Sequence, residues 1–369
     1  MNTGGSTSDT IRVGFLALQA PELSPGQRYR VEAFMPALAD RGISVRYDWL
    51  LDAADLRVFY GPGAVAGKAL VATKAAVRRL GHLVRASGID VWLVQREAFF
   101  LGGAWSERLA RLSAPVVYDF DDAIWIRTTS SANARLAWLK NVSKMPAIAR
   151  LAHTVVAGNE YLATWARGHA RRVVVVPTCV DTDVFAPPVT RPSGGPVTIG
   201  WSGSPSTIAH LRPLLPVLER VRARYGDRVR LRVMGDAAFA HPPLGLSGEA
   251  WSPAAELELL REMDIGLMPL PDDQWTRGKC GLKGLVCMAM GAASVMSPVG
   301  VNTEIVQHGT NGFLPASDEA WYDVLCRLTE DAGLRARVGA DGRRTVVDRY
   351  SVRRWQDTLA TVLLTAARG

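Results

Sequence analysis

Two lysines, Lys279 and Lys283, lie four residues apart in the stretch GKCGLKGLVCMAMG (278–291). If this stretch is helical, the spacing puts both ammonium groups on one face near the beginning of the helix. The amino end of a helix already attracts anions, so two cations there are unfavourable unless a negative group lies between them. The pair therefore indicates an anion site. The alternative is that both lysines only hold a loop, through ion pairs with nearby acids: Asp264, Asp272 or Asp273.

Three loops of the second half share one character, because small residues open a helical stretch in each of them. They read GWSGSPST (200–207), RGKCGLK (277–283) and SPVGVNTE (297–304). Each offers main-chain N–H groups and the positive end of a helix dipole, which suits phosphate. Ordinary N-caps are the alternative for any single loop. Three such loops together predict a diphosphate ligand, with Ser204, Thr207, Lys279 and Lys283 as its contacts.

The elements that must position these loops follow a repeating pattern. Short, valine-rich apolar runs alternate with helical stretches, which is typical of parallel sheets with helices on both faces. The runs are 11–18, 44–50, 90–95, 115–120, 153–158, 172–177, 197–203, 229–235, 264–270 and 293–299. Ligands of such sheets bind beyond the carboxyl ends of the strands, where the three loops begin.

The length of 369 residues suits two domains. The Pro/Gly/Ser-rich stretch APPVTRPSGGP (186–196) has the composition of a linker. We therefore predict an α/β fold of two doubly wound parallel-sheet domains, residues 1–186 and 197–350, followed by a terminal helix over 351–369.

Composition narrows the class of protein. A net charge of +8 suits an anionic partner, such as a nucleotide, a phospholipid surface or an acidic acceptor, and a basic soluble surface is the alternative. Nucleic acid is not an expected partner, because aromatic RNA-binding motifs, helix-turn-helix patterns and paired Cys/His fingers are missing.

Cysteine usage and hydropathy predict a cytoplasmic chain. The four cysteines form no C-x-x-C pair, so we expect reduced and chemically inert thiols (Cys179, Cys280, Cys287 and Cys326). No run approaches 18 apolar residues, and the first ten residues do not have the character of a signal peptide.

The chain resembles GT-B-fold glycosyltransferases, specifically those of glycosyltransferase family 4 and its close relatives, from about residue 11 to residue 366. The block 264–314 is the most specific part, because it has the order Met-Ala-x-Gly, strand, Ser-Pro-x-Gly, Glu-Ile-Val. The other matching pieces are QRYRVEAFMPALADRGI (27–43), VVYDFDDAIW (116–125), VVAGNEYLATWA (155–166), VVVPTCVDTDVF (174–185) and YSVRRW (350–355).

The resemblance implies transfer of a sugar from a nucleotide-diphosphate donor to an acceptor hydroxyl, with retention of configuration. It implies two Rossmann-like domains that face a cleft, and a terminal helix that packs back on the first domain. It implies no metal ion and no cofactor besides the nucleotide sugar; a magnesium site at DFDD (119–122) is the alternative. Other functions for the scaffold are a sugar-nucleotide epimerase or hydrolase, and a catalytically silent partner subunit. The acceptor stays open.

In the first domain the resemblance assigns two groups of site residues. Gly26 and Arg28 stand where relatives approach the donor phosphates, and Arg28 offers a fork for phosphate oxygens; a surface arginine is its alternative. Asp121, with Asp122 beside it, is the candidate catalytic carboxylate, which would orient the acceptor hydroxyl, stabilise positive charge at the anomeric carbon or act as a base.

Two further residues, Asn159 and Glu160, are expected to point toward the cleft. N-capping is the alternative role for Asn159.

In the second domain the resemblance assigns the donor pocket. Lys283 is a catalytic candidate as well as a diphosphate contact, because it would stabilise the leaving group. The nucleoside would lie at Gly235, Trp251 and Glu304, with Trp251 stacking on the base; packing is the alternative for Trp251 and helix capping for Glu304. The donor sugar would lie beside Gly281, Gly300, Val301 and Asn302.

One departure from the family concerns two carboxylates. Family 4 typically has Glu-x7-Glu, the first holding the donor sugar and the second the ribose, and those positions are Gly278 and Val286 here. Lys279 and Lys283 instead match a divergent subgroup with Lys-x-x-x-Lys. Contacts to the sugar and the ribose must therefore come from other residues.

Residues 64–86 predict an amphipathic helix with five cations and no acid: Lys68, Lys74, Arg78, Arg79 and Arg85. Many relatives glycosylate lipid-linked acceptors, and a basic face of this kind suits anionic lipid. Peripheral membrane contact through this helix is therefore one expectation, and a solvated face is the other.

Overall fold

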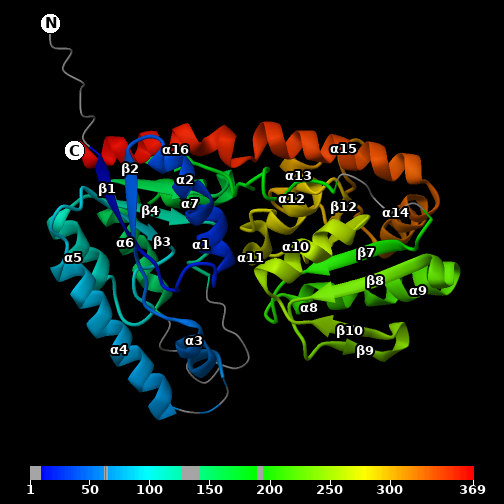
Figure 1. Cartoon of the computed structure of the whole chain (residues 1–369), viewed down its shortest axis with the longest axis horizontal. Helices are drawn as coiled ribbons and strands as arrows, with labels where there is room; N and C mark the ends of the chain where they lie inside the picture. The colour runs from blue at the N-terminus through cyan, green and yellow to red at the C-terminus, as the bar shows by residue number, and fades with distance from the viewer. Residues whose placement is uncertain (1–9, 62, 64, 127–140, 189–193) are drawn as a thin grey trace, which may run out of the picture. The chain divides into compact units, whose positions relative to one another are not determined.

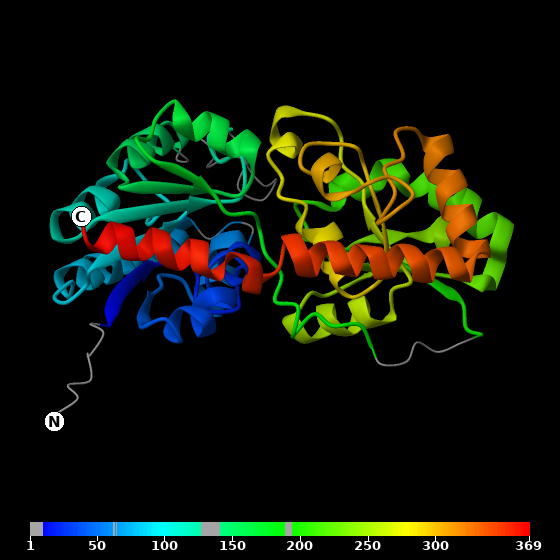
Figure 2. The same ribbon diagram turned by 90° about the horizontal axis from the view of Figure 1, so that it is seen from above.

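Each of the ten predicted apolar runs forms a strand, and two further strands were not predicted. The computed structural model describes residues 10–61, 63, 65–126, 141–188 and 194–369. The chain forms two compact units, Met1–Thr178 together with Trp355–Gly369, and Cys179–Arg354. Each unit has a six-stranded sheet of its own. Figures 1 and 2 show strands flanked by helices in both units. The predicted α/β class with two parallel-sheet domains is confirmed.

The first unit has the strand order β2-β1-β3-β4-β5-β6, and its described pairings are all parallel. The strands are β1 (Ile11–Leu16), β2 (Ile43–Asp48), β3 (Val91–Gln95), β4 (Val116–Phe120), β5 (Thr154–Ala157) and β6 (Val173–Val175). The helices are α1 (Pro25–Arg30), α2 (Met35–Ala39), α3 (Ala53–Tyr60), α4 (Val65–Val84), α5 (Trp105–Ser113), α6 (Met145–Leu151), α7 (Glu160–Arg167) and α16 (Val352–Ala367).

The strand order of this sheet places its ligand edge. From β1 the chain goes to β2 on one side, and from β2 it crosses back over β1 to β3 on the other side. The direction in which strands are added therefore reverses between β1 and β3. The loops after these two strands are where a doubly wound sheet binds ligands. Strands β3 and β4 are buried along their whole length, as expected for valine-rich strands covered on both faces.

Arg79 ties three loops together at this edge of the sheet. It lies on α4, has no exposed surface, and donates to the main-chain carbonyl oxygens of Ala17, Asp48 and Ala98 over 2.7, 2.9 and 2.9 Å. Burial lowers the pKa of Arg79 to about 9, so it stays charged at neutral pH. These carbonyls lie at or just beyond the ends of β1, β2 and β3, so one cation fixes the edge that carries the candidate site.

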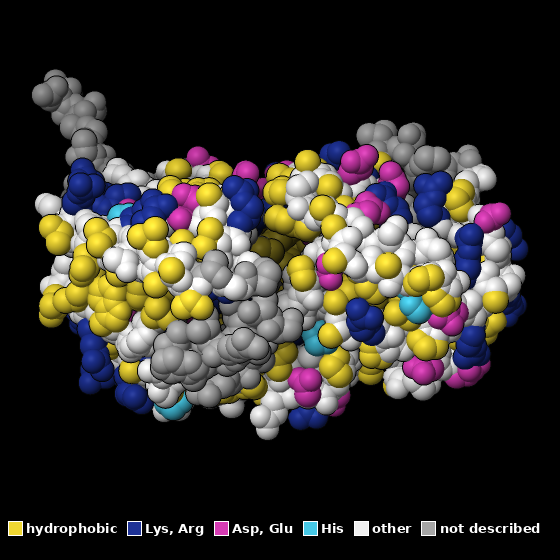
Figure 3. Space-filling view, turned by 90° about the horizontal axis from the view of Figure 1, so that it is seen from below, with side chains coloured by type: hydrophobic (Ala, Val, Ile, Leu, Met, Phe, Trp, Pro, Cys, Tyr) yellow, Lys and Arg dark blue, Asp and Glu magenta, His cyan; other side chains and the backbone are white. Residues whose placement is uncertain are grey.

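The solvated basic face expected over residues 64–86 is only partly present, because the fold buries two of its five cations, whereas Lys74 and Arg85 stay exposed. Lys68 and Arg79 are buried. Lys74 forms an ion pair with Asp55 at 2.9 Å. Arg78 donates to a main-chain carbonyl oxygen. Helix α4 also exposes several large apolar side chains, and Figure 3 shows hydrophobic side chains gathered over this part of the first unit: Val65, Leu70, Val77, Leu80 and Val84.

The second unit has the strand order β12-β11-β7-β8-β10-β9, parallel except for the pairing of β9 with β10. The strands are β7 (Val197–Ser202), β8 (Val229–Met234), β9 (Ala240–His241), β10 (Leu246–Glu249), β11 (Ile265–Met268) and β12 (Ala293–Met296). The helices are α8 (Ile208–Leu211), α9 (Leu215–Tyr225), α10 (Pro253–Glu262), α11 (Gln274–Arg277), α12 (Leu282–Ala289), α13 (Asn302–Ile305), α14 (Asp318–Glu330) and α15 (Ala332–Arg349).

The core of the second unit joins β7 and β8 to α9 and α14. Trp201 from β7 and Leu218 from α9 are buried in it, together with Trp321 and Leu325 from α14. The core fixes the strand from which the loop 203–207 departs. None of the helices in the described part of the chain is both long and apolar enough to cross a membrane.

The unit boundaries differ from the predicted ones, which were 186 and 350. Residues 179–185 belong to the second unit because main-chain hydrogen bonds link Val180 to Tyr350 and Val352. Arg343 adds a bond from its guanidinium to the carbonyl oxygen of Thr182 at 2.7 Å. The boundary therefore precedes the Pro/Gly-rich stretch, and lies between Thr178 and Cys179.

Candidate functional site

Lys283 lies in the first turn of α12 with its ammonium group against the end of β7. Its Nζ donates to Thr207 Oγ1 at 3.2 Å and lies 4.3 Å from the centre of the Trp201 ring. The face of an indole ring is electronegative and holds a cation by electrostatic attraction. The structure therefore brings together two predicted diphosphate residues, Lys283 and Thr207, on a buried aromatic platform that sequence reasoning missed.

The loop after β7 is shaped by glycine and by hydroxyl groups. A Cβ on Gly203 would lie 2.2 Å from the Trp201 ring, so only glycine fits beside it. Thr207 Oγ1 accepts the main-chain N–H of Ser204 at 2.9 Å. Gly235 has a φ of 124°, and a Cβ there would lie 2.4 Å from the Gly203 carbonyl oxygen. Gly235 thus lets the loops after β7 and β8 meet backbone to backbone.

The electrostatics of this cluster favour an anion. Burial, and next the charge of Lys279, lower the pKa of Lys283 to about 7. Burial, Lys283 and Lys279 also lower the pKa of His210, a half-buried residue on α8 that sequence reasoning missed. Burial raises the pKa of Cys287 to about 12, so this thiol stays neutral, in agreement with an inert role. A bound anion would relieve the repulsion that these shifts report.

The acids named in the ion-pair alternative hold other groups. Asp272 pairs with Arg277 at 2.6 Å. Asp273 caps α11 by accepting a main-chain N–H at 2.8 Å. Asp264 accepts a main-chain N–H from the start of β7 at 2.8 Å. In each of these three contacts the partner is a group other than a lysine.

Of the three helix dipoles expected at the site, the structure supports one. Helices α8 and α13 have four residues each, whereas α12 has eight. Because the macrodipole is a sum of aligned peptide dipoles, a single turn contributes little of it. Helix α12 begins after Gly281, whose φ of 71° makes it a left-handed N-cap. The lysine side chains, more than helix ends, therefore supply the positive charge.

The four residues predicted beside the donor sugar pack together. A Cβ on Gly281 would lie 3.4 Å from Val301 Cγ1 and 3.5 Å from Asn302 Oδ1. Gly300 has a φ of 54°, and a Cβ there would lie 2.6 Å from the Arg277 carbonyl oxygen. The start of α12 and the turn before α13 thus form one contiguous wall.

The structure says less about two of the residues predicted to contact the nucleoside, Trp251 and Glu304. Trp251 is half-buried and directly precedes Ser252, the N-cap of α10, and its stacking on a base stays a prediction. Glu304 is exposed on α13. That helix begins at Asn302, and both roles expected for Glu304, nucleoside contact and helix capping, stay predictions.

In the first unit, Arg96 is the central residue that sequence reasoning missed. Its Nε donates to Asp121 Oδ1 at 2.9 Å and its Nη2 donates to Asp122 Oδ2 at 2.5 Å. Its φ of 64° is a left-handed conformation that a non-glycine residue adopts at a cost and that clusters at functional sites. Gly26 is close by, since a Cβ on it would lie 3.5 Å from Arg96 Nη2. The candidate carboxylates are therefore fixed by a cation from the neighbouring loop.

The remaining predicted residues of this unit have local roles. Asn159 accepts the Leu162 N–H at 2.9 Å, which confirms its N-cap role. Glu160 is exposed and forms an ion pair with Arg167 on the same helix. Arg28 lies half-buried within α1, with its guanidinium 5.5 Å from the centre of the Tyr29 ring, so it belongs to a helix and not to a glycine-rich turn.

The DFDD stretch is built for ion pairs with arginine. Asp119 and Arg30 form a buried ion pair, and Arg96 holds Asp121 and Asp122. Among the residues that the structure describes, no group of three or more His, Cys, Asp or Glu is arranged to hold a metal ion. The magnesium alternative therefore has no support from these side chains.

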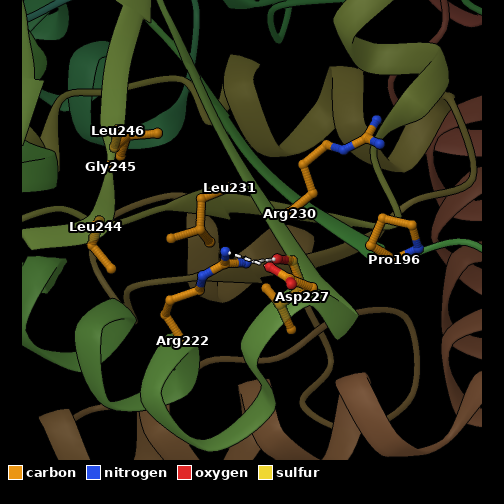
Figure 4. Close-up of a pocket in the computed structure, with 9 residues that line it drawn as sticks. Pro196, Arg222, Asp227, Arg230, Leu231, Leu244, Gly245 and Leu246 are labelled. Carbon is orange, nitrogen blue, oxygen red and sulfur yellow. Dashed lines mark hydrogen bonds and ion pairs between the residues drawn. The ribbon is translucent and has the colours of Figure 1, made fainter.

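A pocket of 340 Å³ lies elsewhere in the second unit, as Figure 4 shows. It is lined by Pro196, the start of β8 and residues 244–246, which places it at the amino ends of β7 and β8. Arg222 and Asp227 point toward each other within it and form an ion pair at 2.9 Å. Arg230 is a third charged residue of its lining, and none of the predicted site residues lines it.

Comparison with known proteins supports the two-domain fold, and one protein family matches part of the second unit. A family described as glycosyl transferases group 1 matches residues 196–331. HepE of Anabaena, solved in complex with UDP and glucose, is 16% identical over 96% of this chain and 100% of its own, with a TM-score of 0.67. Sucrose-phosphate synthase of Thermosynechococcus elongatus is 12% identical over 97% and 98%, with a TM-score of 0.68. A glycosyltransferase of Rickettsia africae is 13% identical over 98% and 99%, with a TM-score of 0.66.

No curated protein sequence matches the chain. The structural likeness extends over both units, and the family match lies within the unit that carries Lys283. The chain therefore has the two-domain GT-B fold, and residues 196–331 are similar to the glycosyl transferases group 1 family.

Proposed function

We propose that this protein transfers a sugar from a nucleoside diphosphate sugar to an acceptor hydroxyl. The observation that carries the proposal is the ammonium group of Lys283, held between Thr207 and Trp201 in a region of excess positive charge. A diphosphate is the ligand that such a site suits, because its oxygens accept hydrogen bonds from an ammonium, hydroxyls and main-chain N–H groups together. HepE, which shares the fold, was solved with UDP and with UDP-glucose.

In the proposed reaction the bond from the anomeric carbon to the phosphate oxygen breaks, and a bond to the acceptor oxygen forms. Negative charge develops on the leaving diphosphate, and Lys283 and Lys279 would stabilise it. In the retaining course that we propose, the acceptor proton passes to the departing phosphate oxygen. Charge stabilisation by lysines makes a metal ion unnecessary in this scheme.

On the acceptor side we propose that Asp121 orients the acceptor hydroxyl. Its carboxylate is held by Arg96, which fixes its direction. A carboxylate held in this way suits hydrogen bonding to a hydroxyl.

Peripheral membrane contact stays a proposal, and its basis changes from charge to apolar surface. Lys68 and Arg79 of α4 are buried, whereas Leu70, Val77 and Val84 are 71, 66 and 84% exposed at intervals of seven residues. Such a stripe is the part of an amphipathic helix that enters a membrane interface.

The test of the function is ligand binding followed by turnover. Thermal shift measurements with UDP, GDP and dTDP sugars in the presence of EDTA should reveal at least one stabilising ligand. A ligand at 100 times its dissociation constant adds about 2.7 kcal/mol of stability. Stabilisation by none of them contradicts the proposal.

Turnover then separates the alternatives. Consumption of the stabilising donor only when acceptors are present supports a transferase, whereas consumption without acceptor indicates the hydrolase or epimerase. The absence of the two family glutamates favours the alternative of a catalytically silent partner subunit. A silent subunit should bind the donor without turning it over.

The pKa of Lys283 makes a prediction about pH. The diphosphate binds the charged ammonium, so the bound state holds a proton that the free site loses above its pKa of about 7. Affinity for UDP-glucose should therefore fall as pH rises from about 7 to 9, by up to about tenfold per pH unit. His210, whose pKa is lowered, stays neutral in this range, and the diphosphate diester keeps its charge. Titration calorimetry measures the profile, which Lys283→Arg should flatten because arginine stays charged.

A further inference from the structure

The loop that follows β3 in the first unit, residues 96–99, is held by buried side chains from four other elements. Tyr118 of β4 donates its hydroxyl to the carbonyl oxygen of Arg96 at 2.8 Å. Glu107 of α5 accepts the main-chain N–H of Ala98 at 2.8 Å. The carbonyl oxygen of Ala98 accepts the buried guanidinium of α4 described above. Neither Tyr118 nor Glu107 has any exposed surface, so both sides of Ala98 are fixed from within the unit.

The fourth of these side chains is Lys144, which lies in a single 3₁₀ turn directly before α6 and is 3% exposed. Its ammonium group donates to the carbonyl oxygen of Phe99 at 2.6 Å and forms an ion pair with the carboxylate of Glu97 at 2.7 Å. Lys144 therefore binds the loop before and after Ala98. The reaction proposed above does not use this buried cation.

This way of holding a loop is costly. Three of the four side chains are ionisable, and taking a charge out of water costs free energy that an ion pair often fails to repay. The same loop contains Arg96 in a left-handed conformation, with a φ of 64°. A non-glycine residue keeps such a conformation only where its surroundings impose it. The buried side chains around the loop impose it here, because they fix main-chain groups of Arg96, Ala98 and Phe99.

The strained residue is the one that holds the candidate carboxylates. Arg96 donates to Asp121 at 2.9 Å and to Asp122 at 2.5 Å. An arginine fork binds in a fixed plane, so its bonds depend on the direction of the guanidinium as well as on its distance. A rotation of the main chain at Arg96 would turn the guanidinium away from one or both aspartates. The placement of Asp121 thus depends on the loop, and the loop is held by Lys144.

We propose that Lys144 is a positioning residue for the acceptor side of the reaction. It holds residues 96–99 in the conformation in which Arg96 reaches both aspartates, and it acts on Asp121 through that loop. The proposal rests on the proposed function, because it needs Asp121 to orient the acceptor hydroxyl. It goes beyond that function by assigning a role in the reaction to a buried lysine from a different element.

NMR of arginine side chains on the full chain tests the coupling without any ligand. The Nε–H groups of Arg96 and Arg30 each donate to an aspartate of the first unit, and the loss of each signal in Arg96→Lys and Arg30→Lys identifies it. In Lys144→Met, hydrogen exchange with water at Arg96 should become faster by about tenfold or more, because the loop can open. Exchange at Arg30 should stay within about twofold of wild type, because its ion pair does not involve the loop.

Two further variants complete this measurement. Lys74→Met is the matched control, because it removes an exposed lysine of the same unit and should change neither signal. If Lys144→Met does not fold, Glu97→Gln replaces it, since this change removes the ion pair at the loop and keeps the volume of the side chain. Exchange at Arg96 should then become faster by about threefold or more, because the bond from Lys144 to Phe99 remains.

Turnover connects the loop to the reaction. With the donor and acceptor that wild type converts, Lys144→Met should lower kcat by about tenfold or more, because the carboxylate that orients the acceptor is displaced. Affinity for UDP, measured by titration calorimetry, should stay within about twofold, because Lys144 and the lysine cluster belong to different units.

Three results overturn the proposal. The first is unchanged exchange at Arg96 in Lys144→Met. The second is faster exchange at Arg96 and Arg30 by the same factor, since this is the behaviour of a residue that only stabilises the unit. The third is faster exchange at Arg96 with an unchanged kcat. Failure of the proposed function looks different: wild type would convert no donor, and the role of Lys144 in transfer would fall with it although the exchange results stood.

Discussion

Lys283→Ala is expected to weaken UDP binding by about 2 to 3 kcal/mol, or about 30- to 150-fold, through loss of a charged hydrogen bond in a partly enclosed site. The residue contacts Thr207 and Trp201, and neither of them carries a charge that would replace the ammonium. Lys279 remains in the variant and keeps part of the attraction. Titration calorimetry at pH 6.5 measures the loss under conditions in which the wild-type ammonium is charged.

Two companion variants identify the cause of that loss. Lys283→Met keeps the packing against Trp201 and should bind UDP as weakly as the alanine variant. Arg261→Ala removes an exposed positive charge from the same unit and should leave affinity within about twofold, because exposed charges are screened by salt. Both Lys283 variants should fold, because the fold already penalises a charged lysine there, as the lowered pKa shows. UDP affinity of Lys283→Ala equal to that of wild type would remove Lys283 from the site.

Arg79→Met is expected to lower the free energy of unfolding by about 3 kcal/mol, because buried carbonyl oxygens lose their donor. Methionine replaces the aliphatic stem of Arg79 but cannot donate to Ala17, Asp48 or Ala98. The carbonyls lie at or just beyond the ends of three different strands, so the variant would remove their common anchor. Urea unfolding, followed by a probe in the first unit, measures the change.

Arg85→Met is the matched control for this prediction. It changes the same residue type on the same stretch of chain, but the side chain is exposed, so stability should stay within about 0.5 kcal/mol of wild type. An Arg79→Met protein as stable as the control would show that the three loops hold without the arginine.

The sequence predicted the strands well, because burial on both faces leaves a continuous apolar run. Strands β9 and β10 were missed because they have two and four residues, with a Pro-Pro pair between them, and so show no periodicity. The helix over residues 65–84 was also predictable, but which of its cationic side chains would be buried was not. Arg79 and Arg85 are the same residue type six positions apart, and only the tertiary structure makes one an internal anchor and leaves the other exposed.

Part of the candidate site was also predictable from the sequence. Lys283 and Thr207 were found because each lies in a loop after a strand, where the parallel sheet guarantees proximity. Arg96 follows β3 in the same way, and its position gave a signal that was not used. Trp201 gave no signal, since an aromatic residue in an apolar strand is ordinary, and its contact with Lys283 joins two distant parts of the sequence.

The first unit is built from two separate pieces of the chain, and this affects the order in which the units can finish folding during biosynthesis. Its sheet is finished at β6, but it still lacks α16, where Leu359, Leu363 and Ala366 are buried and Asp357 pairs with Arg41. The second unit, Cys179–Arg354, is continuous and leaves the ribosome before that helix does. The half that is translated first is therefore the last to close, and its uncovered apolar surface is what a chaperone would meet on the nascent chain.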